Sequence, residues 1–133
     1  MNINDGLVTV RSVHSYGVTL ERFRSALMQA GLTIFAEIDH RANATAVGLP
    51  LRPTMLLVFG NPRGGTPLMQ MNQTVAVELP LRAIVWEDDK GAAWITHPDP
   101  HALAQRYQLG SAAEPVWSAM SDGMKRLTAV AAA

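Results

Sequence analysis

The chain has 133 residues, of which 48% are hydrophobic, and its 11 Lys and Arg residues balance 11 Asp and Glu residues. This length and apolar content fit one domain over residues 1–133 with one contiguous core. Zero net charge without a basic cluster argues against a nucleic-acid partner, because neutralisation of phosphates drives such binding. The absence of cysteine excludes disulfides, thiolate metal sites and cysteine nucleophiles.

The sequence also carries no sign of a membrane partner. Its first six residues lack the basic start and the apolar run of a signal peptide. Nowhere does an apolar stretch approach the roughly 20 residues that span a bilayer. Together with the missing cysteines, these observations predict a cytoplasmic protein that does not contact a membrane.

Strand and helix patterns alternate in the first part of the chain. The predicted elements are a strand at 7–13, a helix at 18–30, a strand at 33–40 and a short alanine-rich helix at 41–47. Gly31 follows the first helix, where a left-handed C-cap is expected. Period-two alternation in the second strand places Ile34, Ala36 and Ile38 on one face.

The second part of the chain predicts a central strand, a loop, a hairpin and three helices. They are a strand at 55–59, a loop at 60–67, a helix at 68–77, strands at 81–87 and 92–96, a helix at 100–108 and a last helix at about 115–130. Asp88 and its neighbours form the hairpin turn, and Asp99 suits an N-cap with Pro100 at the first helical position. The alanine tail from Ala131 is expected to fray. The whole predicts an α+β domain, with a mostly antiparallel curved sheet of about four to five strands and helices packed on one face.

Several short segments match the pattern of one family, in its order and over about residues 7–110. They are Thr33–His40, Leu51–Thr54, Phe59–Pro62, Gly65–Gln70, Leu79–Arg82, Val85–Asp88 and Asp99–Pro100. Through them the chain resembles the domain of unknown function 302 family. The resemblance implies a compact bacterial α+β domain with a curved sheet backed by helices, and it implies no activity. Members of that family tend to have tyrosine and asparagine where this chain has His97 and Pro98.

The segment from Gly60 to Pro67 is the strongest candidate for a ligand site. It connects a buried strand to a helix, so backbone N–H groups could converge on an anion there. Side chains and backbone groups expected to contribute are those of Asn61, Arg63, Gly64, Gly65 and Thr66. The segment is not a P-loop, because Thr66 and Pro67 replace the required Lys and Ser or Thr. The alternative interpretation is a rigid connection whose glycines supply special backbone angles.

Histidines provide the other candidates. His40, at the end of a strand and beside the core edge, could act as a general acid or base and belong to the same ligand site. The alternative is a partly buried imidazole that backbone carbonyls satisfy. His97 and His101 have the spacing of metal ligands on a helix, but Pro98 and Pro100 prevent a regular helix across them. No metal and no cofactor are therefore predicted.

Two functional hypotheses remain. The first is a non-catalytic module that binds a small anionic ligand or a partner, or forms a homodimer, through a groove near Gly60–Met69. The second is a small enzyme in which His40 is the acid or base and Arg63 with Thr66 holds an anionic substrate. The second requires His40 and the loop to line one cleft, which the sequence does not decide.

Overall fold

The computed structural model describes residues 2–4 and 6–133. Its strands are β1 (Asn2–Asn4), β2 (Leu7–Arg11), β3 (Thr33–Asp39), β4 (Thr54–Gly60), β5 (Leu81–Glu87) and β6 (Ala93–Pro98). Its helices are α1 (Tyr16–Gln29), α2 (His40–Ala46), α3 (Pro62–Met71), α4 (Pro100–Tyr107) and α5 (Glu114–Ala132), with 3₁₀ turns η1 (Gln73–Glu78) and η2 (Ser111–Ala113). The five predicted strands are confirmed, and β1 is an additional edge strand.

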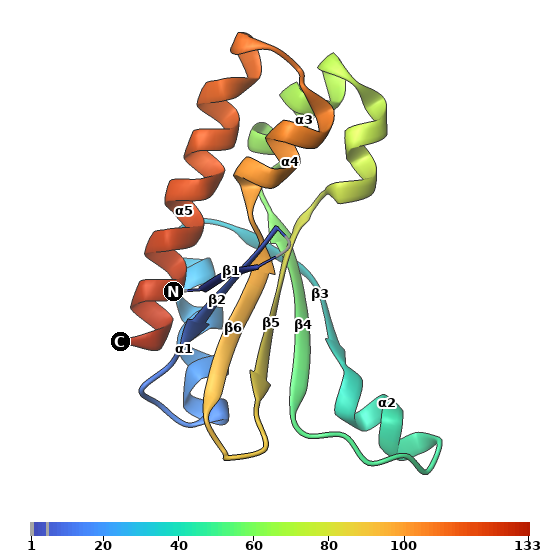
Figure 1. Cartoon of the computed structure of the whole chain (residues 1–133), viewed down its shortest axis with the longest axis vertical. Helices are drawn as coiled ribbons and strands as arrows, with labels where there is room; N and C mark the ends of the chain where they lie inside the picture. The colour runs from blue at the N-terminus through green and yellow to red at the C-terminus, as the bar shows by residue number, and fades with distance from the viewer. Residues whose placement is uncertain (1, 5) are drawn as a thin grey trace.

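The strands form one sheet in the order β1-β2-β6-β5-β4-β3, and every neighbouring pair is antiparallel. Helices α1 and α5 cover one face of this sheet, while α3 and α4 gather beyond one end and α2 projects from the other (Figure 1). The predicted α+β class, with helices on one face, is therefore confirmed. Within the described residues, no helix combines the length and the apolar character needed to cross a membrane.

The main core lies between this helical layer and the sheet. Phe23 of α1 meets Phe59 of β4 edge-on, with ring centroids 5.7 Å apart and planes at 84°. Both rings are fully buried, and Leu57, Val85 and Ile95 extend the same layer across three strands. These residues alternate with less buried ones along each strand, as expected for a sheet with one covered face.

A second hydrophobic cluster lies beyond the end of the sheet, so the expectation of one contiguous core is wrong. It joins α3, η1, α4 and α5 around Leu68, Val75, Leu103 and Trp117. A buried carboxylate closes its edge. Glu78 accepts hydrogen bonds of 2.7 Å from Arg106 Nη1 and 2.9 Å from the Tyr107 hydroxyl.

The other face of the sheet carries no helix among the described elements. Trp86 and Trp94 stack there with ring centroids 6.0 Å apart, and the indole of Trp86 donates to Thr96 Oγ1 at 2.9 Å. The indole of Trp94 donates to Asp88 Oδ2 in the hairpin turn. Asp88 also accepts the backbone N–H groups of Lys90 and Ala92 through Oδ1. This confirms the predicted hairpin turn at Asp88.

The predicted alternation of β3 is wrong at one point. The register with β4 shifts between Ile34 and Ala36, which makes Phe35 a bulge. Ile34 pairs with buried Phe59 and so lies on the covered face of the sheet. After the bulge, Ala36 and Ile38 lie on the opposite face from Ile34. A bulge adds one residue to one strand, and period-two counting cannot detect it.

The predicted loop at 60–67 and helix at 68–77 are also wrong in their boundaries. Helix α3 begins at Pro62, with Asn61 as its N-cap, and contains Pro67. It ends at Met71, and the following residues form the 3₁₀ turn η1. Glycine and proline favour a loop locally, but burial of Leu68 in the second cluster stabilises the helix.

The C-terminal tail does not fray as expected. Helix α5 continues to Ala132, and both Ala131 and Ala132 are buried. Carbonyl groups of the last turn accept hydrogen bonds from the Arg22 guanidinium and from the Val13 N–H, which supplies the partners that a helix end lacks. Tertiary contacts therefore order a segment whose composition predicts mobility.

Candidate ligand-binding groove

A cavity of about 410 Å³ lies between the start of α3 and the middle of α5. Its lining is mostly apolar and comes from three directions. Helix α5 contributes Met120 and Met124, the chain entering β5 contributes Leu79 and Leu81, and Leu32 lies between α1 and β3. A volume of this size is typical of sites for small organic ligands.

Polar groups occur at the rim, where α3 begins. Asn61, Arg63, Gly64 and Gly65 line the cavity, as four of the six predicted ligand residues. Thr66 is absent from the lining, because the helix turns it away from the cavity. The structure thus places the predicted segment at a cavity, but the greater part of that cavity is apolar.

The backbone donors at this helix start are already engaged. Asn61 Oδ1 accepts from the N–H of Arg63 at 3.0 Å, and its carbonyl accepts from Gly64 at 2.8 Å and Gly65 at 3.3 Å. Pro62 has no N–H. An anion would therefore have to rely on the exposed Arg63 guanidinium rather than on converging amides.

Neither glycine in α3 takes a positive φ, and only Gly65 lies where a side chain would be crowded. The described glycines with positive φ are at other positions, such as Gly31, so the predicted reason is wrong for this segment. A Cβ on Gly65 would lie 3.3 Å from Leu79 Cδ1, which is tighter than ordinary contact. The residue lets α3 approach the apolar wall of the cavity closely.

The cavity continues along α5 toward the end of α1. An adjoining hollow of about 430 Å³ shares the lining residues Leu32, Ala119, Gly123 and Leu127 with the first cavity. We call the two together the α5 groove. The α5 side of this site was not predicted from the sequence, although Met120, Met124 and a glycine inside the predicted helix pointed to it.

Gly123 is unusual because it occupies the middle of a 19-residue helix. A glycine there lowers helix stability by roughly 0.8–1 kcal/mol relative to alanine. A Cβ at this position would meet nothing within 4 Å, so internal packing does not require the glycine. Its effect is to leave the floor of the α5 groove open.

His40 does not belong to this groove. It is exposed and is the first residue of α2, rather than a side chain at the core edge. Because β3 and β4 are antiparallel, Gly60 pairs with Thr33, whereas His40 follows the opposite end of β3. Seven strand residues separate the two places by about 20 Å. The structure does not bring His40 and the Gly60–Pro67 segment into one cleft.

His97 is the buried histidine of the chain's described part, with 4% of its surface exposed. Burial lowers the pKa of its imidazole, while the hydrogen bond between Nδ1 and the Pro98 carbonyl and the charge of Asp99 act in the opposite direction. It lines a small cavity of about 100 Å³ with Ser121 and Lys125. Among the described residues, no group of His, Asp and Glu side chains could hold a metal ion.

Fold and groove together define a small α+β domain with a mostly apolar cavity between α3 and α5. The chain belongs to the family described as Domain of unknown function DUF302, whose model matches residues 8–127. A crystal structure of an uncharacterised conserved DUF302 protein from Bacillus stearothermophilus superposes with a TM-score of 0.85. That alignment covers 96% of this chain and 99% of the other at 19% identity, so it supports the fold alone.

The curated relatives are longer proteins. The chain is 45% identical over 130 residues to proteins named Fluoride-specific ion channel FluC 1 from Brucella suis biovar 1 (strain 1330) and Brucella abortus biovar 1 (strain 9-941). The match covers 98% of this chain but only 51% and 48% of those proteins. The chain therefore spans about half the length of the curated relatives that it matches.

Proposed function

We propose that this chain is a non-catalytic binding module whose ligand occupies the α5 groove. The proposal rests on the mostly apolar cavity of about 410 Å³. Its lining includes one charged side chain, that of Arg63, which lies at the rim. Such a site suits a small amphipathic molecule with an apolar body and an anionic end. This ligand class keeps the expected anion and adds the apolar body that the cavity lining favours.

The flexible lining supports the same ligand class. Met120 and Met124 can adapt their side chains to different shapes, because methionine has three rotatable bonds and a polarisable sulfur. Gly123 leaves room beside them at a cost in helix stability. A site that trades stability for open space is typical of a binding function.

The enzyme hypothesis has no support from this geometry. It requires His40 and the Arg63 rim in one cleft, and they lie at opposite ends of β3 and β4. A catalytic acid or base must come within hydrogen-bonding distance of its substrate. We therefore retain binding as the proposed function.

Filling the groove should abolish binding without unfolding the protein. In Gly123→Leu, the new side chain extends into the α5 groove, and the substitution also favours the helix. We expect affinity for the fluorescent anion 1-anilinonaphthalene-8-sulfonate to fall at least about tenfold, equivalent to about 1.4 kcal/mol. Fluorescence titration measures the affinity, and circular dichroism confirms the fold.

Two further variants make this test specific. Gly17→Leu makes the same change on exposed α1, where a Cβ also meets nothing within 4 Å, and should leave binding unchanged. Arg63→Gln should weaken binding of the sulfonate but not of its neutral counterpart N-phenyl-1-naphthylamine. Equal binding by Gly123→Leu and Gly17→Leu, or no binding by the native chain, would refute the groove as the ligand site.

A second part of the proposal concerns the setting of this module. The relatives named as fluoride-specific ion channels contain a segment that matches 98% of this chain within a polypeptide about twice as long. We propose that the module serves as an accessory part of a membrane transport system for fluoride. Its ligand would then modulate transport rather than be transported.

Liposomes containing the Brucella suis relative provide the test of this setting. Deleting the segment that matches this chain should change the rate of fluoride efflux about fivefold or more, which is the range of an allosteric coupling. A fluoride-selective electrode measures efflux, and equal incorporation of both proteins must be verified by immunoblot. Identical efflux with and without the segment, at every tested concentration, would contradict an accessory role in transport.

A further inference from the structure

The segment 33–52 forms an arm at the edge of the molecule. It comprises β3, α2 and the chain that leads toward β4, and it projects at the lower right of Figure 1. In the sheet order, β3 is the terminal strand, so no described strand lies along its outer edge. We call residues 33–52 the edge arm.

The edge arm has well-formed elements but no burial of its own. Within the range 33–52, all of which is described, no residue is buried. Helix α2 has only seven residues, and none of them is buried. Helices shorter than about 12 residues are marginal in water and depend on tertiary packing of one face. On its inner edge the arm is joined to the domain by the pairing of β3 with β4, but α2 keeps its local order without burying a face in this chain.

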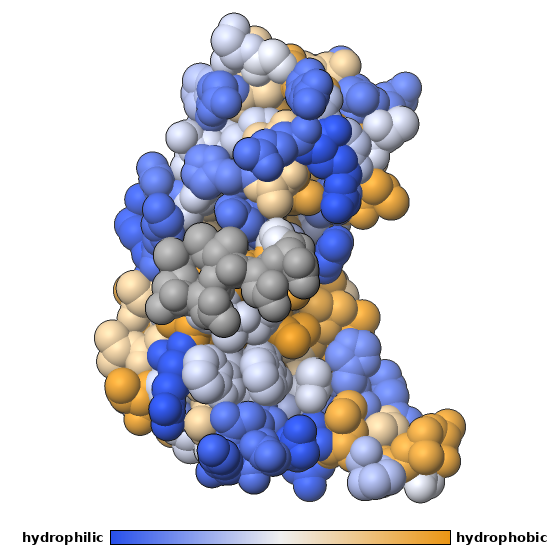
Figure 2. Space-filling view, in the orientation of Figure 1, coloured by the Kyte–Doolittle hydropathy of each residue, from blue (hydrophilic) through white to orange (hydrophobic). Residues whose placement is uncertain are grey.

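Exposed apolar side chains gather on the arm. Five of the large exposed hydrophobic residues are in it, namely Phe35 (50%), Ile38 (37%), Val47 (71%), Leu49 (62%) and Leu51 (44%). Figure 2 shows the corresponding hydrophobic colouring at the same projecting end of the molecule. An exposed cluster of this kind marks an interaction surface rather than scattered surface residues.

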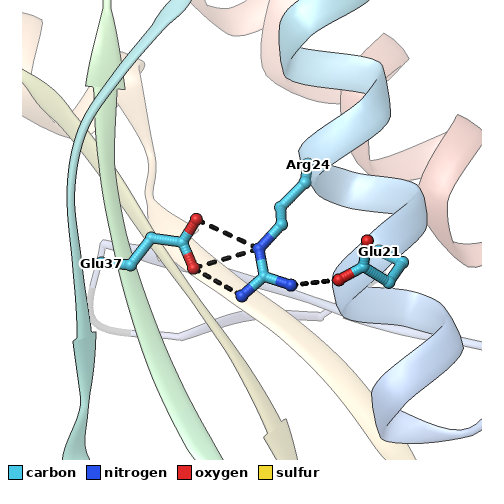
Figure 3. A network of polar contacts seen from close by, with 3 residues as sticks. All are labelled: Glu21, Arg24 and Glu37. Atoms are coloured by element: carbon cyan, nitrogen blue, oxygen red, sulfur yellow. Dashed lines mark hydrogen bonds and ion pairs between the residues drawn. The ribbon is translucent and has the colours of Figure 1, made fainter.

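The inner side of β3 is anchored to the domain. Arg24 of α1 donates to the Glu37 carboxylate, with Nη2 at 2.6 Å from Oε1, and it also pairs with Glu21 (Figure 3). Hydrogen bonding to Glu37 raises the pKa of this guanidinium. Asp39 is engaged differently, since its side chain caps α2 by accepting from the N–H of Ala42. Both acidic side chains of β3 therefore already have partners within the chain.

We propose that a second copy of this chain covers the edge arm, and that the two β3 strands pair antiparallel about a two-fold axis. The outer edge of β3 offers backbone N–H and C=O groups, and strands at sheet edges normally carry lysine or proline when pairing must be avoided. The seven residues of β3 include neither. The bulge at Phe35 lies near the start of the strand and leaves the regular stretch from Ala36 to Asp39 available.

Charge and area are both compatible with a second copy. Within the arm, Glu37 and Asp39 balance Arg41 and Arg52, so two copies would meet without net charge repulsion. Its five apolar side chains expose roughly 400–500 Å² on each copy, so a pair would bury up to about 800–1,000 Å² through them, close to the least that a specific interface needs. Backbone pairing of β3 adds to that area.

Charged substitutions on the arm should dissociate the dimer. In Val47→Lys with Leu49→Lys, the monomer loses no buried contact, whereas the dimer would have to bury two charges. We expect the native chain to sediment as a dimer at about 100 μM, and the double variant to bind itself at least about 30-fold more weakly. Analytical ultracentrifugation measures both.

The chain offers a closely matched control. Val77→Lys with Met28→Lys changes two residues that are 75% and 68% exposed but lie outside the arm, on η1 and α1. This control should remain dimeric. A native chain that is monomeric at about 100 μM, or a dimer that both double variants weaken equally, would overturn the proposal.

A cross-linking experiment tests the pairing of the two β3 strands directly. Because the chain has no cysteine, a variant with Ala36→Cys carries a single thiol at the exposed outer part of β3. A short bis-maleimide should convert this variant to a covalent dimer, while Val77→Cys should remain monomeric on a denaturing gel. A dimer in solution with cross-linking only at position 77 would place the interface elsewhere and refute the β3 pairing.

Discussion

Replacing Phe59 by alanine should destabilise the domain by about 3–5 kcal/mol, one of the largest effects available to a single substitution. The ring is fully buried in β4 and meets Phe23 of α1 edge-on, so its removal leaves a cavity at the contact between sheet and helical layer. Because domains of this size are stable by roughly 5–15 kcal/mol, much of the folding free energy would be lost. Urea unfolding followed by circular dichroism measures the change.

Phe35→Ala provides the matched control for this prediction. The same side chain is removed from the same sheet, but at a position that is 50% exposed in the edge arm. We expect a loss within about 1 kcal/mol when the protein is studied as a monomer. Similar losses for the two variants would mean that the packing between β4 and α1 does not dominate the stability of the fold.

Trp117→Ala should have a comparable effect, about 3–5 kcal/mol, but it should act on a different part of the molecule. Trp117 is 2% exposed and joins α5 to Leu68 of α3 and Leu103 of α4 in the second cluster. This cluster is separate from the main core, so its loss should first release α3, η1 and α4. Hydrogen exchange measured by mass spectrometry should show faster exchange in those elements.

The contrast with β4 and β5 makes this prediction specific. Their amides should keep the exchange rates of the native protein under conditions in which α3 and α4 open. Val130→Ala, on α5 but 54% exposed, should change neither set of rates. Uniform acceleration across the sheet in Trp117→Ala would show that the two clusters unfold as one unit.

The second cluster supports the walls of the α5 groove. Val116 and Met120 line the cavity on one side of α5, while Trp117 anchors the same helical turn in the cluster. Leu79, on the opposite wall, follows directly after Glu78, which Arg106 and Tyr107 hold in place. The geometry of the groove therefore depends on contacts that lie outside it.

Local sequence determined the five main strands and most helices of this protein. Alternation and β-branched residues identified β2 and β5, and the turn at Asp88 joined the hairpin as expected. Asp99 caps α4 through the N–H of His101, and Gly31 takes the positive φ that a helix C-cap needs. These features depend on residues close together in the chain, which is why their patterns could be interpreted directly.

Tertiary structure decided the rest. The bulge at Phe35, the helix that begins at Pro62 and the ordered end of α5 all contradict local propensity, because contacts distant in sequence stabilise them. The same holds for the candidate site. Its rim at Asn61 and Arg63 was visible as a polar, glycine-rich segment, whereas its apolar wall depends on where α5 packs. Sequence alone also could not separate His40 from that rim, since only the antiparallel pairing of β3 with β4 sends them to opposite ends of the sheet.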